Sequence, residues 1–418
     1  MGSKKSAAVA ALICAGVFSF SQAQNARINA MGGAFIVPDF SRTLYNPAIM
    51  NDYKDQAEIN FGSGAIMGTK SAGKAFSIGA VMNRGLMLNY FYDGAEAELS
   101  SPPGSPTTAS TIPSTFTMQY FPHILWGIDL TTVQIGFDTY LEWDRATYDS
   151  TSEVPGALQE IKEELTVYHP GLIAGFKFNL SSASLLFHLG GGLPTVTGTM
   201  ERRNITPVGT AKLETESGLF GRGGFELNVT LQKADLTIGA DGRYEKFQFS
   251  TLAPTANAEK ERSDKTNEIT ATPYLGVTAH MTNGLLAVGM GRSIFDMVKT
   301  ENDAGTVSTK DYSLRHALIG GVEKQFKKPW KFDSLVLRGG VLWGATTTWV
   351  TDSSAISSPP IPTKTTAKPV TTLGPAYPYL GCGVSKNFFR MDLLLNPASW
   401  NSAFVGPAVS RVTISLMY

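Results

Sequence analysis

The chain has 418 residues, of which 43% are hydrophobic, 10% aromatic and 17% charged. Its 35 basic and 35 acidic residues cancel to a formal charge of +0, so charge gives no reason to expect nucleic acid as a partner. A mean hydropathy of -0.03 is too polar for a helical membrane protein and suits a strand-rich chain that faces apolar surroundings on one side and polar ones on the other.

The first 23 residues have the pattern of a cleaved signal peptide. Lys4 and Lys5 form a basic start, an apolar run covers Ala7 to Phe20, and Ser21-Gln22-Ala23 is a small-x-small cleavage site, so the mature chain would begin at Gln24. The apolar run is short for a membrane anchor. No later run is long enough for a transmembrane helix, so insertion into a membrane would require a β-barrel. We therefore expect export to the bacterial outer membrane.

Residues 24–56 form a segment of their own. Gly32 and Gly33 provide a flexible or tightly turning point, and Asn46-Pro47 starts a turn because the proline biases the asparagine away from helix. With Ala48, these residues predict a compact, mostly irregular plug, or hatch.

From residue 57 to 418 the chain becomes a series of strand-like runs. In one of them Leu236 and Ile238 alternate with Asp235, Thr237 and Asp241. About 16 such runs are present, several longer than the ~10 residues that a membrane crossing needs. They predict an all-β, antiparallel transmembrane β-barrel. The connections support this, because short turns alternate with long polar loops, as in outer-membrane barrels. The short turns lie near residues 181, 233, 283, 328 and 386, and the long loops near 93–113, 149–163, 201–214, 251–266, 300–310, 351–371 and 397–408.

The last strand is predicted to close the barrel. Its apolar positions share one face and its polar positions the other, and a final strand that pairs with the first removes the free edge of the sheet. An edge strand of a soluble sandwich is the alternative. The apolar face consists of Val412, Ile414, Leu416 and Tyr418, and the polar face of Arg411, Thr413 and Ser415.

Two further segments have patterns that suggest a functional role. Residues 156–165 have the spacing of a short amphipathic helix with Leu158, Ile161 and Leu165 on one stripe, within an outer loop. This helix would either capture a hydrophobic ligand or fold over the outer opening of the barrel. Gly190-Gly191-Gly192 is interpreted as a kink where the wall bends. Aromatic residues near the strand ends, Trp343 and Trp349 among them, would fit two interfacial girdles.

Signs of catalytic or metal chemistry are weak. The five histidines show no ligand spacing, and neither a nucleophile elbow nor a phosphate-binding loop is found. We therefore predict no enzyme activity, no metal and no cofactor. An outer-membrane phospholipase would need an exposed Ser–His pair; His188 or His316 could serve, but the spacing favours neither over a plain polar residue.

The N-terminal segment resembles FadL-type outer-membrane proteins, which transport long-chain fatty acids and other hydrophobic compounds, and also the related PorV-type proteins. The resemblance rests on Asn29-Ala-Met-Gly-Gly-Ala-Phe35, on Asp39 and Ser41, and on Tyr45-Asn-Pro-Ala48. Ile49 departs from the glycine that is frequent at this point. The resemblance implies a barrel of about 14 strands with the hatch inside.

The resemblance also implies function and partners. A hydrophobic small molecule would land on outer loops, enter a pocket between hatch and wall, and leave passively, in part sideways through the wall. Outer-membrane lipid, lipopolysaccharide and the barrel-assembly machinery would be further partners.

Two alternatives remain. A PorV-type barrel would bind secretion-system proteins at its rim, which the polar Ser/Thr/Pro-rich loops argue against mildly. A general porin would have an open, charged lumen, which the plug argues against.

Overall fold

The structure is a computed structural model that describes residues 26–31, 33–61, 65–82, 95, 118–120, 122–154, 157–203, 209–252, 260–301, 307–329, 331–352, 365–366, 369–395 and 409–417. The predicted signal peptide, Gly32 and Tyr418 therefore lie outside the described residues.

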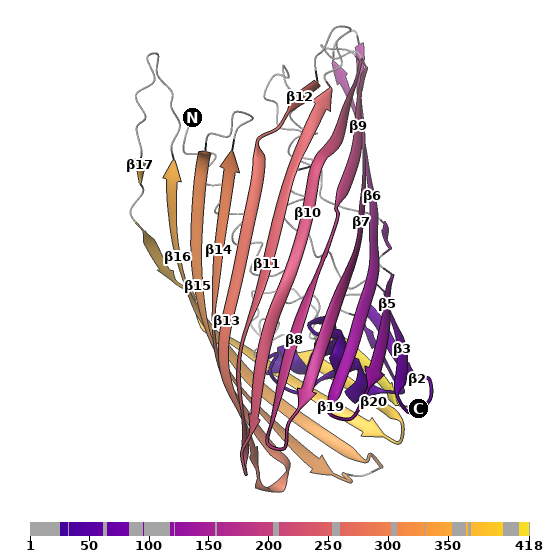
Figure 1. Ribbon diagram of the computed structural model, residues 1–418, viewed down its shortest axis with the longest axis vertical. Coiled ribbons are helices and arrows are strands. Elements are labelled where there is room, and N and C mark those ends of the chain that lie inside the picture. Colours follow the sequence, from indigo (N-terminus) through magenta and orange to yellow (C-terminus); the bar gives the residue numbers. More distant parts are fainter. Residues whose placement is uncertain are drawn as a thin grey trace.

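The protein is a closed antiparallel β-barrel with an N-terminal hatch in its lumen (Figure 1). The barrel strands are β1 (Gln56–Asn60), β2 (Ala65–Ser71), β3 (Phe76–Met82), β4 (Met118–Tyr120), β5 (His123–Asp129), β6 (Val133–Val154), β7 (Ala157–Asn179), β8 (Ala183–Gly192), β9 (Thr195–Arg203), β10 (Gly209–Thr230), β11 (Ala234–Leu252), β12 (Lys260–Arg262), β13 (Lys265–Met281), β14 (Leu285–Glu301), β15 (Val307–Lys327), β16 (Ser334–Asp352), β17 (Thr365–Thr366), β18 (Val370–Leu373), β19 (Tyr377–Lys386), β20 (Phe389–Leu395) and β21 (Val409–Met417).

Within the described ranges these stretches make 16 barrel strands. β4 continues β5, β9 continues β8, β12 continues β13, and β17 and β18 lead into β19. The number agrees with the count of strand-like runs in the sequence and is larger than the 14 that the resemblance implies. The earliest runs are real strands, since β1, β2 and β3 each pair with both neighbours.

The barrel closes where β21 pairs with β1. Glu58 lies opposite Ser415, whose hydroxyl donates a hydrogen bond of 3.3 Å to the Glu58 carboxylate. Thr413 and Ser415 are buried toward the lumen, while Val412 and Ile414, which alternate with them, remain partly exposed on the outer face. The alternation along the strand thus separates a polar lumen from an apolar exterior.

The wall is much taller on one side than on the other. β6, β7 and β10 have 22, 23 and 22 residues, whereas β1, β3 and β20 have 5, 7 and 7. A crossing needs only about 9–11 residues. The longest strands therefore have about twice the length that a membrane crossing needs, and Figure 1 shows them rising far above the hatch.

Large apolar side chains cover the outer surface. Leu189 is 71% exposed, Leu318 58% and Leu275 52%, on three different strands. Such an apolar exterior is expected where the surroundings are lipid. Among the described residues, no helix is both long and apolar enough to cross a membrane.

The prediction of a helix in an outer loop at residues 156–165 is wrong. Ala157 begins β7, which pairs with β6 in continuous register from Val154↔Ala157 to Val133↔Phe178. The second side of this segment pairs with β9, from Glu160↔Arg203 to Tyr168↔Thr195. Backbone hydrogen bonds on both sides outweigh the helical spacing of the apolar residues, because that spacing is only a local preference.

The hatch consists of three short helices, α2 (Ala26–Ala30), η1 (Phe40–Leu44) and η2 (Pro47–Tyr53). The Asp39 side chain caps η1 by accepting from the Ser41 N–H, and Asn46 caps η2 by accepting from the Ala48 N–H. Pro47 suits the first helical position of η2, where no N–H is needed.

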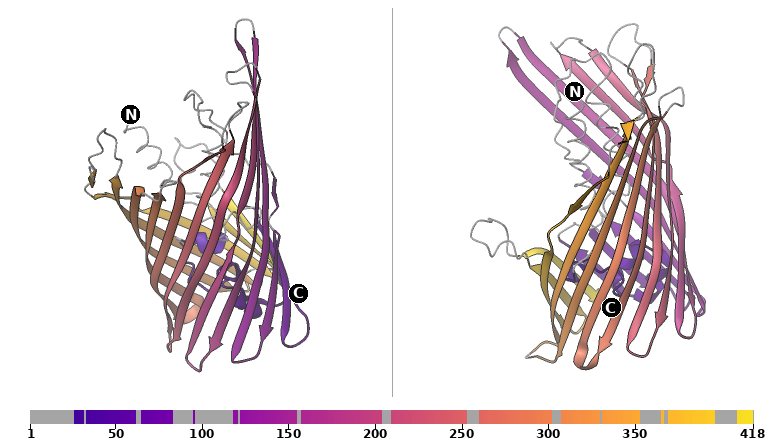
Figure 2. Two further views of the ribbon diagram at one scale, coloured as in Figure 1. Left: turned by 45° about the horizontal axis from the view of Figure 1, so that its top comes forward. Right: turned by 90° about the vertical axis from the view of Figure 1, so that its left-hand side faces the viewer.

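The hatch lies low in the barrel (Figure 2). α2 contacts β16, β19, β20 and β21, and η2 contacts β3, β5, β6 and β7. The segment from Met31 to Val37 packs on Val288, Met290 and Ile319 of β14 and β15. The hatch thus fills this level of the lumen.

Candidate functional site

The tripeptide Asn46-Pro47-Ala48 sits in a notch of the wall made by two glycines. Gly136 and Gly175 lie opposite each other on β6 and β7. A Cβ atom on Gly136 would lie 2.2 Å from the Pro47 carbonyl carbon, and one on Gly175 would lie 2.1 Å from Asn46 Oδ1. Asn46 Nδ2 also donates a 2.9 Å hydrogen bond to the Phe187 carbonyl. The start of η2 therefore lies directly on the wall backbone.

Ion pairs hold the hatch at its two ends. Arg27 donates to both carboxylate oxygens of Glu323, at 2.9 and 3.0 Å. Lys54 pairs with Asp129 at 2.9 Å, and Asp52 with Lys177 at 2.7 Å. The Arg27–Glu323 pair is mostly buried, and breaking a buried pair costs about 3–5 kcal/mol when one charge is left behind. The two lysine pairs are partly exposed and contribute less. Together these contacts oppose displacement of the hatch.

The link from hatch to barrel is fixed by Asp55, which has a positive φ of 60°. Its carboxylate accepts hydrogen bonds from the backbone N–H and the hydroxyl of Ser71, and pairs with Lys70. The Ser71 N–H first, and then Lys70, lower the pKa of Asp55 to about 2. The carboxylate is therefore charged at any physiological pH.

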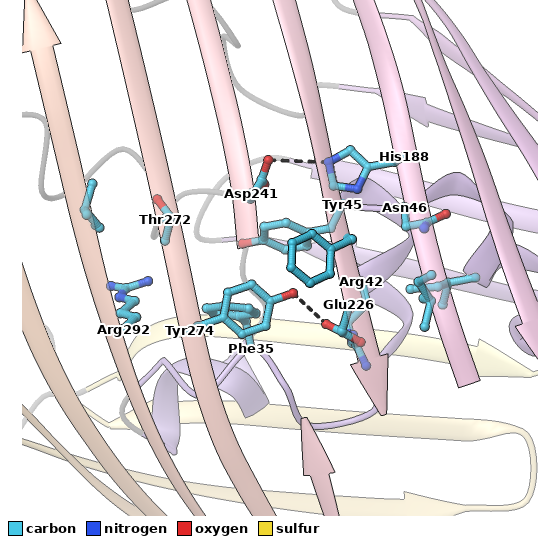
Figure 3. A pocket seen from close by; sticks show the side chains of 14 residues that line it. Phe35, Arg42, Tyr45, Asn46, His188, Glu226, Asp241, Thr272, Tyr274 and Arg292 are labelled. Atoms are coloured by element: carbon cyan, nitrogen blue, oxygen red, sulfur yellow. Dashed lines mark hydrogen bonds and ion pairs between the residues drawn. The ribbon is translucent and has the colours of Figure 1, made fainter. Parts of the chain in front are cut away.

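Between hatch and wall lies a pocket with about 640 Å³ of atom-free space, including the part that opens to the lumen (Figure 3). Phe35, Arg42 and Tyr45 line it from the hatch, and Tyr274 and Arg292 from the wall. The remaining lining residues are Asn46, Ile49, Leu186, His188, Phe225, Glu226, Asp241, Thr272 and Ile294. This mixture of apolar surface with a few polar groups is typical of ligand sites.

Aromatic rings form one side of the pocket. Phe35 meets Tyr274 edge-on at a centroid distance of 4.8 Å and stacks on Tyr45 at 5.8 Å. The guanidinium of Arg222 lies 5.5 Å from the centre of the Tyr45 ring. These contacts join hatch and wall through apolar surface, so a hydrophobic ligand would exchange one apolar contact for another.

Two carboxylates beside the pocket are fully engaged. Glu226 pairs with Arg42 and accepts hydrogen bonds from Tyr274 (2.8 Å) and Asn228 (2.7 Å). Burial alone would lower the pKa of Arg42, but the Glu226 carboxylate outweighs burial and raises it. Arg42 therefore remains a cation that ties η1 to β10.

The second carboxylate, Asp241, pairs with Arg222 at 2.7 Å and with His188 at 3.4 Å. Glu226 and Asp241 thus neutralise Arg42 and Arg222, so these two cations need no anionic group from a ligand.

Arg292 is the exception among these cations. It lines the pocket from β14, and its Nε atom has no hydrogen-bond partner. No carboxylate among the described residues forms an ion pair with it. Arg292 as a whole is partly buried, and its Nε atom is shielded from solvent. A polar group that is shielded from water without a partner is costly, so an anionic group of a ligand in the pocket would be stabilised there.

The wall beside the pocket has an interrupted ladder. Ala271 of β13 pairs with Phe295 of β14, and the next pair is Tyr274 with Arg292. Thr272 and Pro273, with the residues opposite them, fall outside the ladder; Pro273 has no N–H to contribute. This seam between β13 and β14 adjoins the pocket, because Thr272, Tyr274 and Arg292 line it.

Above the hatch level the inner wall carries an apolar cluster. It includes Leu165, Val167, Met200, Phe220 and Phe249, all at most 5% exposed, from β7, β9, β10 and β11. Ala95 packs into the same cluster. Because the lumen of a porin is normally polar, this apolar inner face is unusual for a water-filled channel.

The other residues singled out in the sequence lie as follows. Gly33, Asn46, Pro47 and Ala48 are in the hatch. Leu165 faces the upper lumen, buried in the apolar cluster, and is not on an exposed landing surface. Leu158 and Ile161 have strand backbone opposite Glu153 and Ser150.

The three glycines Gly190 to Gly192 lie in unbroken ladders with both β7 and β10. The interruption of the wall comes directly after them, at Leu193 and Pro194, between β8 and β9. Proline again accounts for the break, because it has no N–H for the ladder.

The charged residues of the lumen mostly pair with one another, as their mixed signs predict; Arg315 with Asp296 is one example. Each histidine meets a polar partner: His123 meets Asp138, His169 meets Glu142, His188 meets Asp241, His280 meets Asp235 and His316 meets Ser293. Within the described ranges, no three His, Cys, Asp or Glu side chains converge as a metal site would need.

Sequence reasoning missed Tyr274, Arg292 and the notch of Gly136 and Gly175. Tyr274 and Arg292 could have been placed in the lumen by alternation along their strands. Their meeting with Phe35 could not have been foreseen, because it depends on how the hatch folds back onto β13 and β14.

The comparisons with known proteins give little beyond the fold. No family model matches the chain, and no curated protein matches it. Among solved structures, the chain is similar to the TodX monoaromatic hydrocarbon channel (deltaS2 mutant), with 10% identity over 94% of this chain and 97% of that chain and a TM-score of 0.37. A likeness of this degree carries no argument about function, so the site must be judged on its own geometry.

Proposed function

We propose that this protein lets small hydrophobic molecules cross the bacterial outer membrane by passive diffusion, and that its preferred substrates carry an acidic head, as long-chain fatty acids do. The observation that carries the proposal is the pocket between hatch and wall, with aromatic lining and the unpaired guanidinium of Arg292. The rings would contact the apolar part of the ligand, and Arg292 would pair with its carboxylate.

The apolar cluster above the hatch supports an entry route. A molecule that leaves water at the upper rim would meet Leu165, Val167 and Phe249 before reaching the pocket. At the level of the hatch the lumen is filled, so further passage requires either a shift of the hatch or an opening of the wall. The interrupted ladder at Thr272 and Pro273 makes the β13–β14 seam the better candidate for such an opening than Gly190–Gly192.

A general porin fits less well, because the hatch contacts β3, β5–β7, β16 and β19–β21 and leaves the lumen filled. For a secretion component the rim loops would have to bind proteins, and no contact among the described residues favours that alternative.

The test is uptake of a labelled long-chain fatty acid by outer-membrane-competent cells that lack their own fatty-acid channel. With the protein at the surface we expect uptake to rise. Arg292→Met should reduce it by about tenfold, since a hydrogen bond to a charged group contributes about 1.5–3 kcal/mol. Arg292→Lys, which keeps the charge, is the matched control and should retain most of the uptake.

A second substrate separates the two parts of the proposal. The methyl ester of the same acid has no charge, so Arg292→Met should take it up as well as the wild type does. If the wild-type barrel is folded and raises uptake of neither compound, hydrophobic transport is wrong. If it raises both equally, and Arg292→Met changes nothing, only the acidic preference is wrong.

A further inference from the structure

The outer, lipid-facing surface has a hollow across β13 to β16. Gly289 and Gly291 of β14 and Gly320 of β15 form its floor, and Leu275, Leu318 and Trp343 stand among its walls. The hollow has about 840 Å³ of atom-free space, including its open side. A Cβ atom on Gly289 would meet nothing within 4 Å, so the hollow is open to the exterior.

The walls of this hollow belong to the apolar exterior of the barrel. Leu275 is 52% exposed, Leu318 58% and Trp343 40%. The hollow is therefore continuous with the surface that already faces lipid, and its natural occupant is an acyl chain of the surrounding membrane.

One end of the hollow is marked by a polar pair on the same outward face. On the outward face of β14, Ser293 is the next residue after Gly291. On the outward face of β15, His316 is the residue just before Leu318. The two residues are opposite each other in the ladder, and Ser293 Oγ lies 2.8 Å from His316 Nδ1. The other ring nitrogen of His316, Nε2, has no hydrogen bond to any described residue. A free polar group facing lipid is costly, which indicates an acceptor supplied from outside the chain.

The position of the pair fits the level of lipid ester groups. Next along the outward faces comes an aromatic row, in which Phe295 lies 6.2 Å from Tyr312 and Tyr312 stacks on Trp349 at 5.6 Å, measured between ring centres. Aromatic rows of this kind settle at the headgroup level of a bilayer. Ser293 and His316 lie between that row and the apolar hollow, which is where the ester of a lipid joins its acyl chain.

We propose that this surface is a binding site for one ester-linked acyl chain of a membrane lipid. The chain occupies the glycine-floored hollow, and the Nε2–H of His316, with Nδ1 accepting from Ser293, donates a hydrogen bond to the ester carbonyl oxygen. The site lies on the outer face and does not depend on the function of the lumen.

The arrangement supports binding and not ester hydrolysis. A nucleophilic serine needs its histidine oriented by a third group on the second ring nitrogen. Among the described residues no carboxylate or amide contacts His316 there. Ser293 instead holds the imidazole ring of His316 in a fixed orientation.

The experiment uses the full-length barrel in nanodiscs that contain a trace of phosphatidylethanolamine with a photoreactive diazirine in one acyl chain. After irradiation, the labelled residues are mapped by mass spectrometry. We expect labelling to concentrate on the outward positions of β14 and β15. Gly291→Phe, which fills the hollow, should reduce that labelling several-fold, whereas Gly221→Phe, which adds the same bulk to the outward face of β10, should leave it unchanged.

A second probe tests the head of the site. An ether-linked analogue with the same diazirine chain has no ester carbonyl and should label the hollow less than the ester does in the wild type. In His316→Ala the two probes should label it equally. Uniform labelling around the barrel, or equal labelling by both probes in the wild type, would overturn the proposal. Release of free fatty acid from the ester probe would overturn it in favour of hydrolysis.

Discussion

At the scale of single residues, glycines decide how closely hatch and wall approach. Gly136 and Gly175 have no side chains to keep the hatch away, and Asn46, Pro47 and Ala48 occupy the space that Cβ atoms would take. Gly289 lies on the outer face with open space beside it. A larger side chain should therefore displace the hatch when it replaces Gly136 or Gly175, and should be accommodated when it replaces Gly289.

We predict that Gly136→Val loosens the hatch. The new Cβ would lie 2.2 Å from the Pro47 carbonyl carbon, far inside contact distance, so η2 must move away from β6. Overpacking of this kind costs about 1–3 kcal/mol. The single-channel conductance in planar bilayers should rise above the wild-type value. Gly289→Val is the control and should conduct like the wild type. Equal conductance for all three proteins would show that the notch does not hold the hatch.

At the scale of elements, the longest strands continue past the length that a membrane crossing would require. β6 and β7 continue their pairing to Val154↔Ala157, and the upper part of β7 also pairs with β9. The helical spacing of Leu158, Ile161 and Leu165 does not produce a helix there, because a strand on each side provides hydrogen-bond partners for the backbone N–H and C=O groups. The hairpin is thus an extension of the wall.

We predict that the hairpin can be shortened without loss of the barrel. Replacing residues 149–162 by Asn-Gly leaves Tyr148 opposite Glu163, as a two-residue turn requires. Leu165 and Val167 remain in the apolar cluster of the upper lumen. The shortened protein should keep the heat-dependent gel shift of a folded barrel and fatty-acid uptake near the wild-type level. A large loss of uptake from a folded barrel would instead restore a capture role for Leu158 and Ile161.

At the scale of the whole molecule, the hatch and the barrel are separate layers joined at Asp55. The barrel closes through the pairing of β1 with β21, and the hatch adds to β21 a hydrogen bond from the Ala26 N–H to the Thr413 hydroxyl, 2.9 Å long. No strand of the barrel needs the hatch for its ladder. The hatch therefore controls the lumen and not the closure of the sheet.

We predict that deletion of residues 26–50 gives a folded but open barrel. The protein should still require detergent and show the heat-dependent gel shift, because the wall is intact. Its single-channel conductance should rise strongly, because the segment that fills the lumen is gone. A folded barrel with unchanged conductance would mean that this segment does not close the lumen.

The sequence alone determined what depends on local periodicity. Alternation along each run separated lumen from exterior, as at Thr413 and Val412 in β21 and at Thr237 and Ile238 in β11. Asn283-Gly284 predicted the short turn between β13 and β14, and Asn46-Pro47 predicted the start of η2. These features depend on residues that are neighbours in the chain, and their physics is local.

Only the tertiary structure decided which residues meet. Tyr274 and Arg292 become part of a pocket because the hatch places Phe35 and Tyr45 against them, across more than two hundred residues of chain. The β7 segment becomes a strand because β6 and β9 flank it. Ser293 and His316 face each other through the register of β14 and β15. Such contacts follow from ring closure and strand register, which no local pattern in the sequence encodes.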